Sequence, residues 1–474
     1  MLAALDANPA AARYSVALNV ALWLAYHFGA PADAFGAEAC GTGSRLDGRD
    51  SEVAELGAYW MRYASAAYGA LLLKVMALQD GLPRFSNARE EVAWAIETHC
   101  GIPAEDILLI HRFRGFDKRP SFYVALDRQK KQVVLCIRGT ANVGDTIIDL
   151  VCESVPCSAK GCTDAFAHEG ILRGARLILA DVLPTLSRAL LENEDFGLVV
   201  CGHSLGAGTA VLITTLIFAA SSQPRGFWKT PGDGCAAKRR RVGDTWSRRV
   251  GESSWTKLVH MLGFKSASME ARGEHEDVNE IVFDQELLDV VTKAGVECYA
   301  FAPPPTFQGD PPPRAAAVTK NFVHRYDCVP TLSGRSVFRV LKFIDVIDDL
   351  DLSFMDRLRL LGQTCLGSDR SSGNAKLLCD ALEQALEPPI PSEFARIVAP
   401  LQHVGDIYLL SPSKPSDWLT ANYEMNAVPG ASLADVSPSL YMLTDHLPTA
   451  YESALKSAAR VKCDDDRSSE GLEL

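Results

Sequence analysis

The sequence predicts an α/β fold in which a mostly parallel central sheet is covered by helices on both faces. From about residue 106 onward, short β-branched and aromatic runs alternate with helical stretches, which is the pattern of a parallel sheet with crossover helices. The run FGLVVCGHS (196–204) is apolar almost throughout, as expected of a strand buried on both faces. The helical stretch 207–220 follows almost at once, so a very short turn must join the two.

The elements can be placed along the chain from their periodicity and their end signals. A helix over 51–73 begins with a serine cap, and a long helix is expected over 169–192. Helices also fill the chain between about 331 and 398, and a last helix covers 447–460. The expected strands are 106–113, 121–127, 132–140, 196–204, 296–305, 321–330 and 405–412.

The alternating pattern defines one main domain with additions. Residues 96–460 form the α/β domain, and residues 1–95 precede it as an N-terminal helical extension. The segment 221–290 does not fit the alternation and is expected to be a flexible or regulatory insertion. The acidic tail 461–474 is expected to be disordered.

Composition narrows the class of protein. The 474 residues are 47% hydrophobic, which is enough for a large core, and the net charge of −12 argues against a nucleic-acid partner. The 13 cysteines include no CxxC pair, and the run Cys152, Cys157, Cys162 is more typical of a core than of a metal site, so we expect no metal and no cofactor. We find no signal peptide, which favours a cytoplasmic location. The apolar stretch 14–30 is borderline in length for a membrane span and is expected to be a buried or interfacial helix.

Ser204 is the candidate nucleophile. Gly202-His203-Ser204-Leu205-Gly206 forms a G-x-S-x-G pattern at the junction of the buried strand and the helix. A sharp turn there pushes the hydroxyl outward, the glycines avoid a clash between strand and helix, and the helix start aims N–H groups at a reacting oxygen. A glycine-rich turn of a nucleotide-binding fold is the other interpretation, but G-x-G-x-x-G is absent. The pattern therefore predicts an α/β-hydrolase fold.

A nucleophilic serine needs a base, and the base needs an orienting carboxylate, in the chain order Ser, Asp or Glu, His. Asp327 follows the strand sequence NFVHRY at the exit end of the sheet and is the candidate acid. His403 precedes the strand 405–412 and would lie at its entry end, whereas His446 follows that strand and is the candidate base. Four further acids fall on a helical stretch and are more typical of a solvated face: Asp345, Asp348, Asp349 and Asp351.

Acyl transfer also needs two donors for the oxyanion. The backbone N–H of Leu205, directly after the serine, is one candidate. The turn after the strand 132–140 supplies the other, with Thr140 placed at the strand end. An ordinary strand-end turn is the alternative interpretation of this Arg-Gly-Thr sequence.

Several motifs, taken together and in order, resemble those of a known family. The chain resembles class 3 lipases and, within them, the sn-1-specific diacylglycerol lipases, over roughly residues 55–460. The resemblance implies Ser204, Asp327 and His446 as nucleophile, acid and base, Thr140 at the oxyanion position, and a lid over about 141–160. The motifs are MRYASAAYG (61–69), CGIPAEDILL (100–109), VVLCIRGTANVGDTIIDL (133–150), AHEG (167–170), CGHSLGAGTAVL (201–212), CYAFAPPP (298–305), RYDCVP (325–330) and DHLPTAYESAL (445–455).

The resemblance implies hydrolysis of a fatty-acyl ester of a glycerolipid, with the sn-1 chain of diacylglycerol as the first candidate. A phospholipase A1, a galactolipase or a triacylglycerol lipase would use the same residues. A lipid-binding scaffold without turnover is the alternative from another class of protein.

Membrane contact is a separate expectation. Animal diacylglycerol lipases carry several transmembrane helices before the catalytic domain, and here that block is missing or reduced to 14–30. The basic segment 221–264 holds three of the seven tryptophans, and together with the lid it is the candidate for contact with a membrane surface. A disordered loop is one alternative interpretation of this segment. A nuclear localisation signal at KRRR (238–241) is another.

Overall fold

The computed structural model describes residues 19, 21–23, 48–78, 80, 82–112, 119–140, 154–157, 165–221, 283–365, 373–384, 399–413, 422–433, 439 and 441–470. Most of the predicted insertion 221–290 and of the predicted lid 141–160 lies outside these ranges.

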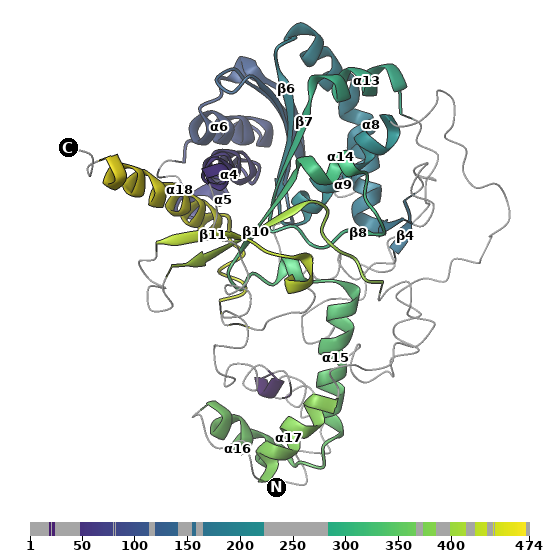
Figure 1. Ribbon diagram of the computed structural model, residues 1–474, viewed down its shortest axis with the longest axis vertical. Helices are drawn as coiled ribbons and strands as arrows, with labels where there is room; N and C mark the ends of the chain where they lie inside the picture. Colours follow the sequence, from purple (N-terminus) through teal and green to yellow (C-terminus); the bar gives the residue numbers. More distant parts are fainter. Residues whose placement is uncertain are drawn as a thin grey trace, which may run out of the picture.

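An eight-stranded sheet forms the centre of the molecule, in the order β1-β2-β3-β6-β7-β9-β10-β11 (Figure 1). Neighbouring strands from β3 to β10 are parallel, whereas β2 is antiparallel to β1 and β3, and β11 is antiparallel to β10. The predicted mostly parallel sheet is therefore confirmed. Its strands are β1 (Ile107–His111), β2 (Phe122–Asp127), β3 (Gln132–Ile137), β6 (Gly197–His203), β7 (Val296–Phe301), β9 (Thr319–His324), β10 (Asp406–Pro412) and β11 (Tyr423–Ala427).

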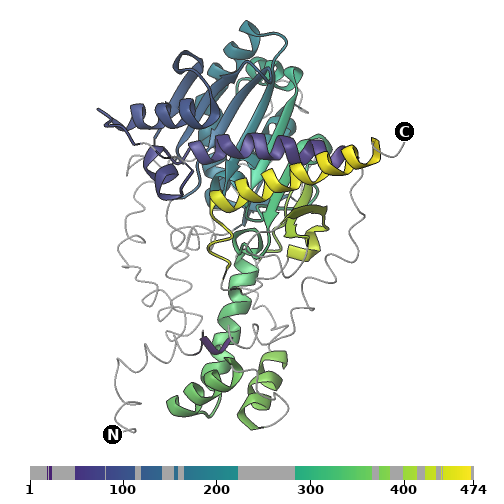
Figure 2. The same ribbon diagram turned by 90° about the vertical axis from the view of Figure 1, so that its left-hand side faces the viewer.

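Side chains that alternate along the strands fill two hydrophobic cores, one on each face of the sheet. Along β3, Leu135 and Ile137 belong to one core, and Val134 and Cys136 belong to the other. Helices α8, α9 and α13 cover the first face, and α4, α6 and α18 cover the second (Figures 1 and 2). These helices are α4 (Gly48–Ala66), α6 (Ala88–Cys100), α8 (Glu169–Glu192), α9 (Leu205–Ser221), α13 (Gln285–Ala294) and α18 (Pro448–Glu470).

Helix α6 is bounded by local signals at both ends. The side chain of Asn87 accepts hydrogen bonds from the N–H groups of Arg89 and Glu90, and Gly101 adopts a left-handed φ of 77° just after the helix. The predicted domain boundary at residue 95 falls inside this helix. Because α4 and α6 supply side chains to the core on the second face of the sheet, they pack as part of the α/β domain rather than as a separate extension.

Several short strands are absent from the sequence prediction. β11 adds an edge to the main sheet, and β4, β5 and β8 form a small antiparallel sheet. These strands have between 2 and 5 residues, which is too short for a periodicity to stand out. The remaining short elements are β4 (Ser154–Pro156), β5 (Phe166–His168), β8 (Phe307–Gln308), α5 (Ala70–Val75), α14 (Pro313–Val318), η1 (Ala104–Asp106), η3 (Val329–Thr331) and η5 (Gly430–Leu433).

Three helices form an arm that stands apart from the sheet (Figures 1 and 2). The arm has a small hydrophobic core of its own, in which Leu22 and Trp23 are buried. The side chain of Asn19 donates to Asp348 at 2.9 Å and accepts from Arg357 at 2.7 Å. The helices of the arm are α15 (Gly334–Asp349), α16 (Phe354–Cys365) and α17 (Gly373–Gln384).

The described part of the apolar stretch 14–30 is therefore buried against protein. Within the described ranges, no helix combines the length and the apolar character that crossing a bilayer requires.

Helix α18 continues to Glu470, beyond the predicted end at residue 460. The stretch between these two positions contains no glycine or proline, and the first helix-breaking residue is Gly471. Most of the segment 461–474, which the sequence predicts as a disordered tail, is thus helical backbone, and 471–474 lies outside the described residues.

Candidate active site

Ser204 lies in the turn between β6 and α9, with a left-handed φ of 59°. This conformation is strained for a residue with a side chain, and the N–H of Ser204 donates to the Phe301 carbonyl on β7 at 2.8 Å. A Cβ on Gly202 would lie 2.6 Å from the Gly206 carbonyl oxygen, and a Cβ on Gly206 would lie 2.3 Å from the Ile137 carbonyl oxygen. The close approach of α9 to β6 and β3 therefore requires both glycines of the motif.

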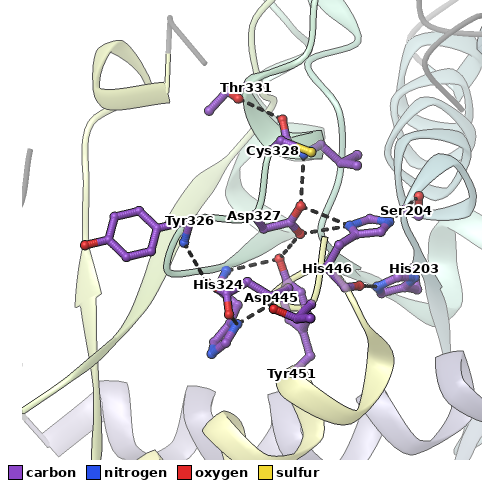
Figure 3. Close-up of polar contacts among 12 residues, drawn as sticks. His203, Ser204, His324, Tyr326, Asp327, Cys328, Thr331, Asp445, His446 and Tyr451 are labelled. Carbon is purple, nitrogen blue, oxygen red and sulfur yellow. Dashed lines mark hydrogen bonds and ion pairs between the residues drawn. The ribbon is translucent and has the colours of Figure 1, made fainter. Parts of the chain in front are cut away.

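The structure brings Ser204, His446 and Asp327 together at the exit ends of the parallel strands (Figure 3). Ser204 Oγ lies 3.0 Å from His446 Nε2, and His446 Nδ1 lies 3.0 Å from each carboxylate oxygen of Asp327. Ser204 is 0%, Asp327 3% and His446 7% exposed. In this arrangement the hydroxyl donates to Nε2 and Nδ1–H donates to the carboxylate, so the serine proton has an acceptor whose positive charge would be offset.

The carboxylate of Asp327 is held by two further donors. The backbone N–H of Val329 donates to Oδ1 at 2.9 Å, and the hydroxyl of Tyr451 donates to Oδ2 at 2.7 Å (Figure 3). Burial and the charge of Asp327 raise the pKa of Tyr451 well above its ordinary value, so the phenol keeps its proton and remains a donor. Tyr451 was not predicted as a site residue, and its only signal in the sequence is its place in the motif DHLPTAY.

The two candidate oxyanion donors follow the two strands from which they were expected, β6 and β3. Leu205 is the first residue of α9 and follows Ser204 directly. Thr140 is half-buried and follows β3 by way of Gly139. A Cβ on Gly139 would lie 2.9 Å from Ser204 Cβ, so the turn that carries Thr140 passes directly against the serine.

A second carboxylate joins the loops that carry the acid and the base. Asp445 Oδ2 accepts from the N–H of Tyr326 at 3.3 Å and lies 3.9 Å from Arg325 Nε. Its backbone carbonyl accepts from His324 Nδ1 at 3.1 Å. Burial raises the pKa of Asp445 to about 6 and lowers the pKa of His324 to about 4, so His324 is neutral near pH 7. No sequence motif indicates this cluster, because its contacts join segments that are distant in sequence.

The other candidate base and the other candidate acids lie elsewhere in the fold. His403 Nε2 donates to the Pro330 carbonyl at 2.9 Å, and burial lowers the pKa of His403 to about 4. It makes no contact with Ser204 in the described residues. Asp345, Asp348 and Asp349 belong to α15 in the arm, and Asp351 follows that helix.

Ser204, Asp327 and His446 follow one another in the chain order used by α/β-hydrolases, on a sheet of the matching, mostly parallel kind. The protein thus has the α/β-hydrolase fold. The family model described as lipase (class 3) matches residues 134–245, which include most of β3 and all of β6, the serine turn and α9. Residues 134–245 are thus similar to a class 3 lipase domain, and the chain is similar in sequence to diacylglycerol lipases.

Three curated relatives illustrate this similarity. Diacylglycerol lipase-beta of Mus musculus is 36% identical over 199 residues, which cover 38% of this chain and 30% of that protein. Diacylglycerol lipase-alpha of Homo sapiens is 36% identical over 104 residues, covering 20% of this chain and 10% of that protein. Secreted mono- and diacylglycerol lipase A of Penicillium camembertii is 33% identical over 94 residues, covering 20% and 30%. The chain thus spans less than a third of the length of each of these relatives.

Solved structures of fungal lipases also align with the chain. The Rhizomucor miehei lipase propeptide complex aligns with 86% of this chain and 80% of its own, at 13% identity and a TM-score of 0.40. The strand order and the strained serine turn, rather than this structural alignment, define the fold of the chain.

Proposed function

We propose that the protein is a serine hydrolase that cleaves a fatty-acyl ester of a glycerolipid. The observation that carries the proposal is the line of contacts from Ser204 Oγ through the His446 imidazole to Asp327, with both distances at 3.0 Å. Such a line lets a buried histidine take the serine proton while a fixed carboxylate offsets the imidazolium charge.

The proposed reaction has two halves. Ser204 Oγ attacks the ester carbonyl carbon as its proton moves to His446 Nε2, and the backbone N–H groups of Leu205 and Thr140 stabilise the oxyanion. The ester C–O bond then breaks, and the glycerol oxygen leaves with the proton from His446, which gives an acyl-serine. Water attacks this acyl group, transferring a proton to His446, and the fatty acid leaves as the proton returns to Ser204.

Aromatic and aliphatic side chains that are exposed close in sequence to the proposed triad support a lipid substrate. Tyr326 precedes Asp327 and Leu447 follows His446, and these two side chains are 39% and 42% exposed. Tyr441 and Leu443, from the loop before the base, are 39% and 49% exposed. Exposed aromatic and aliphatic side chains are suited to contact with acyl chains or with a lipid surface.

The sn-1 chain of diacylglycerol is the first candidate for the substrate bond, in line with the diacylglycerol lipases among the relatives. A phospholipase A1, a galactolipase and a triacylglycerol lipase are the alternatives within the same chemistry. The deciding experiment offers the 474-residue chain each glycerolipid with differently labelled sn-1 and sn-2 chains, with Ser204→Ala as the blank. Release of the sn-1 label from diacylglycerol alone is expected; absence of release from every lipid would contradict the proposal and favour a lipid-binding scaffold.

We further propose a cytoplasmic protein that binds membranes peripherally. The proposed contact surfaces are the lid near 141–160 and the basic segment 221–264, most of which lies outside the described residues. Co-sedimentation with anionic vesicles is expected to weaken when 221–264 is deleted. Equal sedimentation of the deletion and the wild type would remove this segment from the proposal.

A further inference from the structure

His203 is the last residue of β6 and directly precedes Ser204. Its ring is buried at 1% exposure, and both ring nitrogens have partners: Nδ1 lies 2.8 Å from the Tyr68 hydroxyl, and Nε2 lies 2.9 Å from the His446 backbone carbonyl. The imidazoles of His203 and His446 lie side by side, with centroids 4.8 Å apart (Figure 3). The motif histidine thus contacts the residue that carries the proposed base.

The contacts of His203 fix where its proton lies. A backbone carbonyl can only accept, so Nε2 of His203 must donate to the His446 carbonyl. Burial and, next, the neighbouring His446 hold the pKa of His203 well below its ordinary value, so the ring carries a single proton near pH 7. Nδ1 is therefore an acceptor, and the Tyr68 hydroxyl donates to it. A neutral ring also adds no charge beside His446 when that imidazole becomes positive.

The backbone of His446 needs this support because the residue lies in the turn segment 441–447, before α18 begins. Its side chain contacts Ser204 and Asp327, but the position of the ring also depends on the peptide from which it extends. Since His203 and Ser204 are consecutive residues at the end of one central strand, the same rigid element can position both the nucleophile and the backbone of the base.

Tyr68 and His203 both pack against the turn that carries Thr140. A Cβ on Gly139 would lie 2.6 Å from the Tyr68 hydroxyl and 2.5 Å from the His203 carbonyl oxygen. The Arg138 guanidinium lies over the Tyr68 ring, 5.6 Å from its centroid. The pair is therefore packed between the proposed oxyanion turn and the segment that carries the base.

We propose that Tyr68 and His203 are a positioning pair for the reaction, in which the His203 Nε2–H holds the backbone of His446 at the distance from Ser204 that proton transfer requires. The proposal rests on the proposed hydrolase function, because the pair acts only through Ser204 and His446. Tyr68 orients the ring of His203 by donating a hydrogen bond to Nδ1. Its contribution to the rate is expected to be smaller than that of His203 itself.

Three variants of the full chain separate positioning from packing. His203→Gln places an amide N–H near the position of Nε2, whereas the shorter amide of His203→Asn reaches only the region of Nδ1. Tyr68→Phe removes one hydroxyl from a buried ring. Tyr299→Phe is the matched control, because its hydroxyl also belongs to a buried ring but donates to Glu297 at 2.6 Å rather than to His203.

The readout is kcat per active site on a short-chain ester, with active sites counted by stoichiometric fluorophosphonate labelling. We expect kcat to fall roughly ten- to hundredfold in His203→Asn, with KM unchanged, and to recover largely in His203→Gln. Tyr68→Phe should lose roughly tenfold, and Tyr299→Phe should keep the wild-type value.

A purely structural pair would lower the fraction of labelled protein and leave kcat per labelled site unchanged, and that result in His203→Asn and Tyr68→Phe would overturn the proposal. If His203→Asn does not fold, the comparison of Tyr68→Phe with Tyr299→Phe decides. Wild-type protein that neither labels nor hydrolyses esters would instead overturn the proposed function, so the two failures are distinguishable.

Discussion

The hydroxyl of Tyr451 lies 2.7 Å from Asp327 Oδ2, the same oxygen that lies 3.0 Å from His446 Nδ1. Tyr451 belongs to α18, which begins two residues after the candidate base, and its hydroxyl also accepts from the backbone N–H of His324 at 3.0 Å. The last helix therefore ties the segment that carries the acid to the segment that carries the base.

Tyr451→Phe is expected to lower kcat roughly tenfold, because one hydrogen bond to the ionised Asp327 is lost and the carboxylate is less firmly oriented. The His324 N–H also loses its acceptor, so the free energy of unfolding should fall by about 1–3 kcal/mol. Ester hydrolysis and urea unfolding measure the two effects. Tyr59→Phe is the control, since Tyr59 also donates to a carboxylate, that of Asp127, outside the site. Equal kcat losses in both variants would contradict a specific role for Tyr451.

The strained serine turn predicts that Gly206→Ala is severe. Its Cβ would lie 2.3 Å from the Ile137 carbonyl oxygen, a backbone atom that cannot move without shifting β3. We expect loss of fluorophosphonate labelling and a lower melting temperature. Gly362, on α16, has no atom within 4 Å of an added Cβ, so Gly362→Ala should be neutral or stabilising by about 0.5–1 kcal/mol. Similar behaviour of the two variants would contradict the packing argument.

Asp445 should give the protein a pH-dependent stability. Burial raises its pKa to about 6 from an ordinary value of 3.8, so folding favours the protonated carboxyl. This contribution is complete below about pH 4 and is lost as the pH rises through 6. The melting temperature of the wild type relative to Asp445→Asn should therefore fall between pH 4 and 6 and level off above 7. A constant difference across this range would contradict the assignment.

Glu452 should act in the opposite direction. It lies 2.7 Å from His99 Nε2 and joins α18 to α6. Burial alone would raise its pKa, but the hydrogen bond and charge of His99, with smaller help from Ser65 and Lys456, lower it to about 2 from 4.5. Its stabilisation is complete above pH 4.5 and is lost as the pH falls towards 2.

Glu452→Gln is therefore expected to lower the free energy of unfolding at pH 7 by on the order of 2–3 kcal/mol. Urea unfolding of both proteins between pH 7 and pH 3 measures the difference, which should shrink below pH 4. A difference that stays constant with pH would show that Glu452 does not titrate as proposed.

The main elements of the fold were predictable because their signals are local. The helix expected over 169–192 coincides with α8, and the strand expected over 196–204 contains β6, which is one residue shorter at each end. The strands β4, β5, β8 and β11 were not predicted, because strands this short do not show a recognisable period-2 pattern. The end of α18 was missed because the acidic composition of 461–470 indicated disorder, whereas no residue there interrupts a helix.

Some residues of the candidate site could be predicted from the sequence, and others could not. Ser204, Asp327 and His446 could be proposed from a motif, the chain order and the exit ends of strands, and their catalytic roles stay predictions. Tyr451 and Asp445 could not, because their contacts join segments that are distant in sequence. His203 was visible only as the variable residue of G-x-S-x-G, and its contact with the His446 carbonyl exists only in the folded chain.

The most direct test of the proposed triad is the rate at which a fluorophosphonate labels the 474-residue chain, with peptide mapping of the adduct. We expect a single adduct on Ser204 in the wild type and labelling at least about a thousandfold slower in His446→Ala. Labelling of His446→Ala at the wild-type rate, or an adduct on another residue, would contradict the claim that His446 activates Ser204.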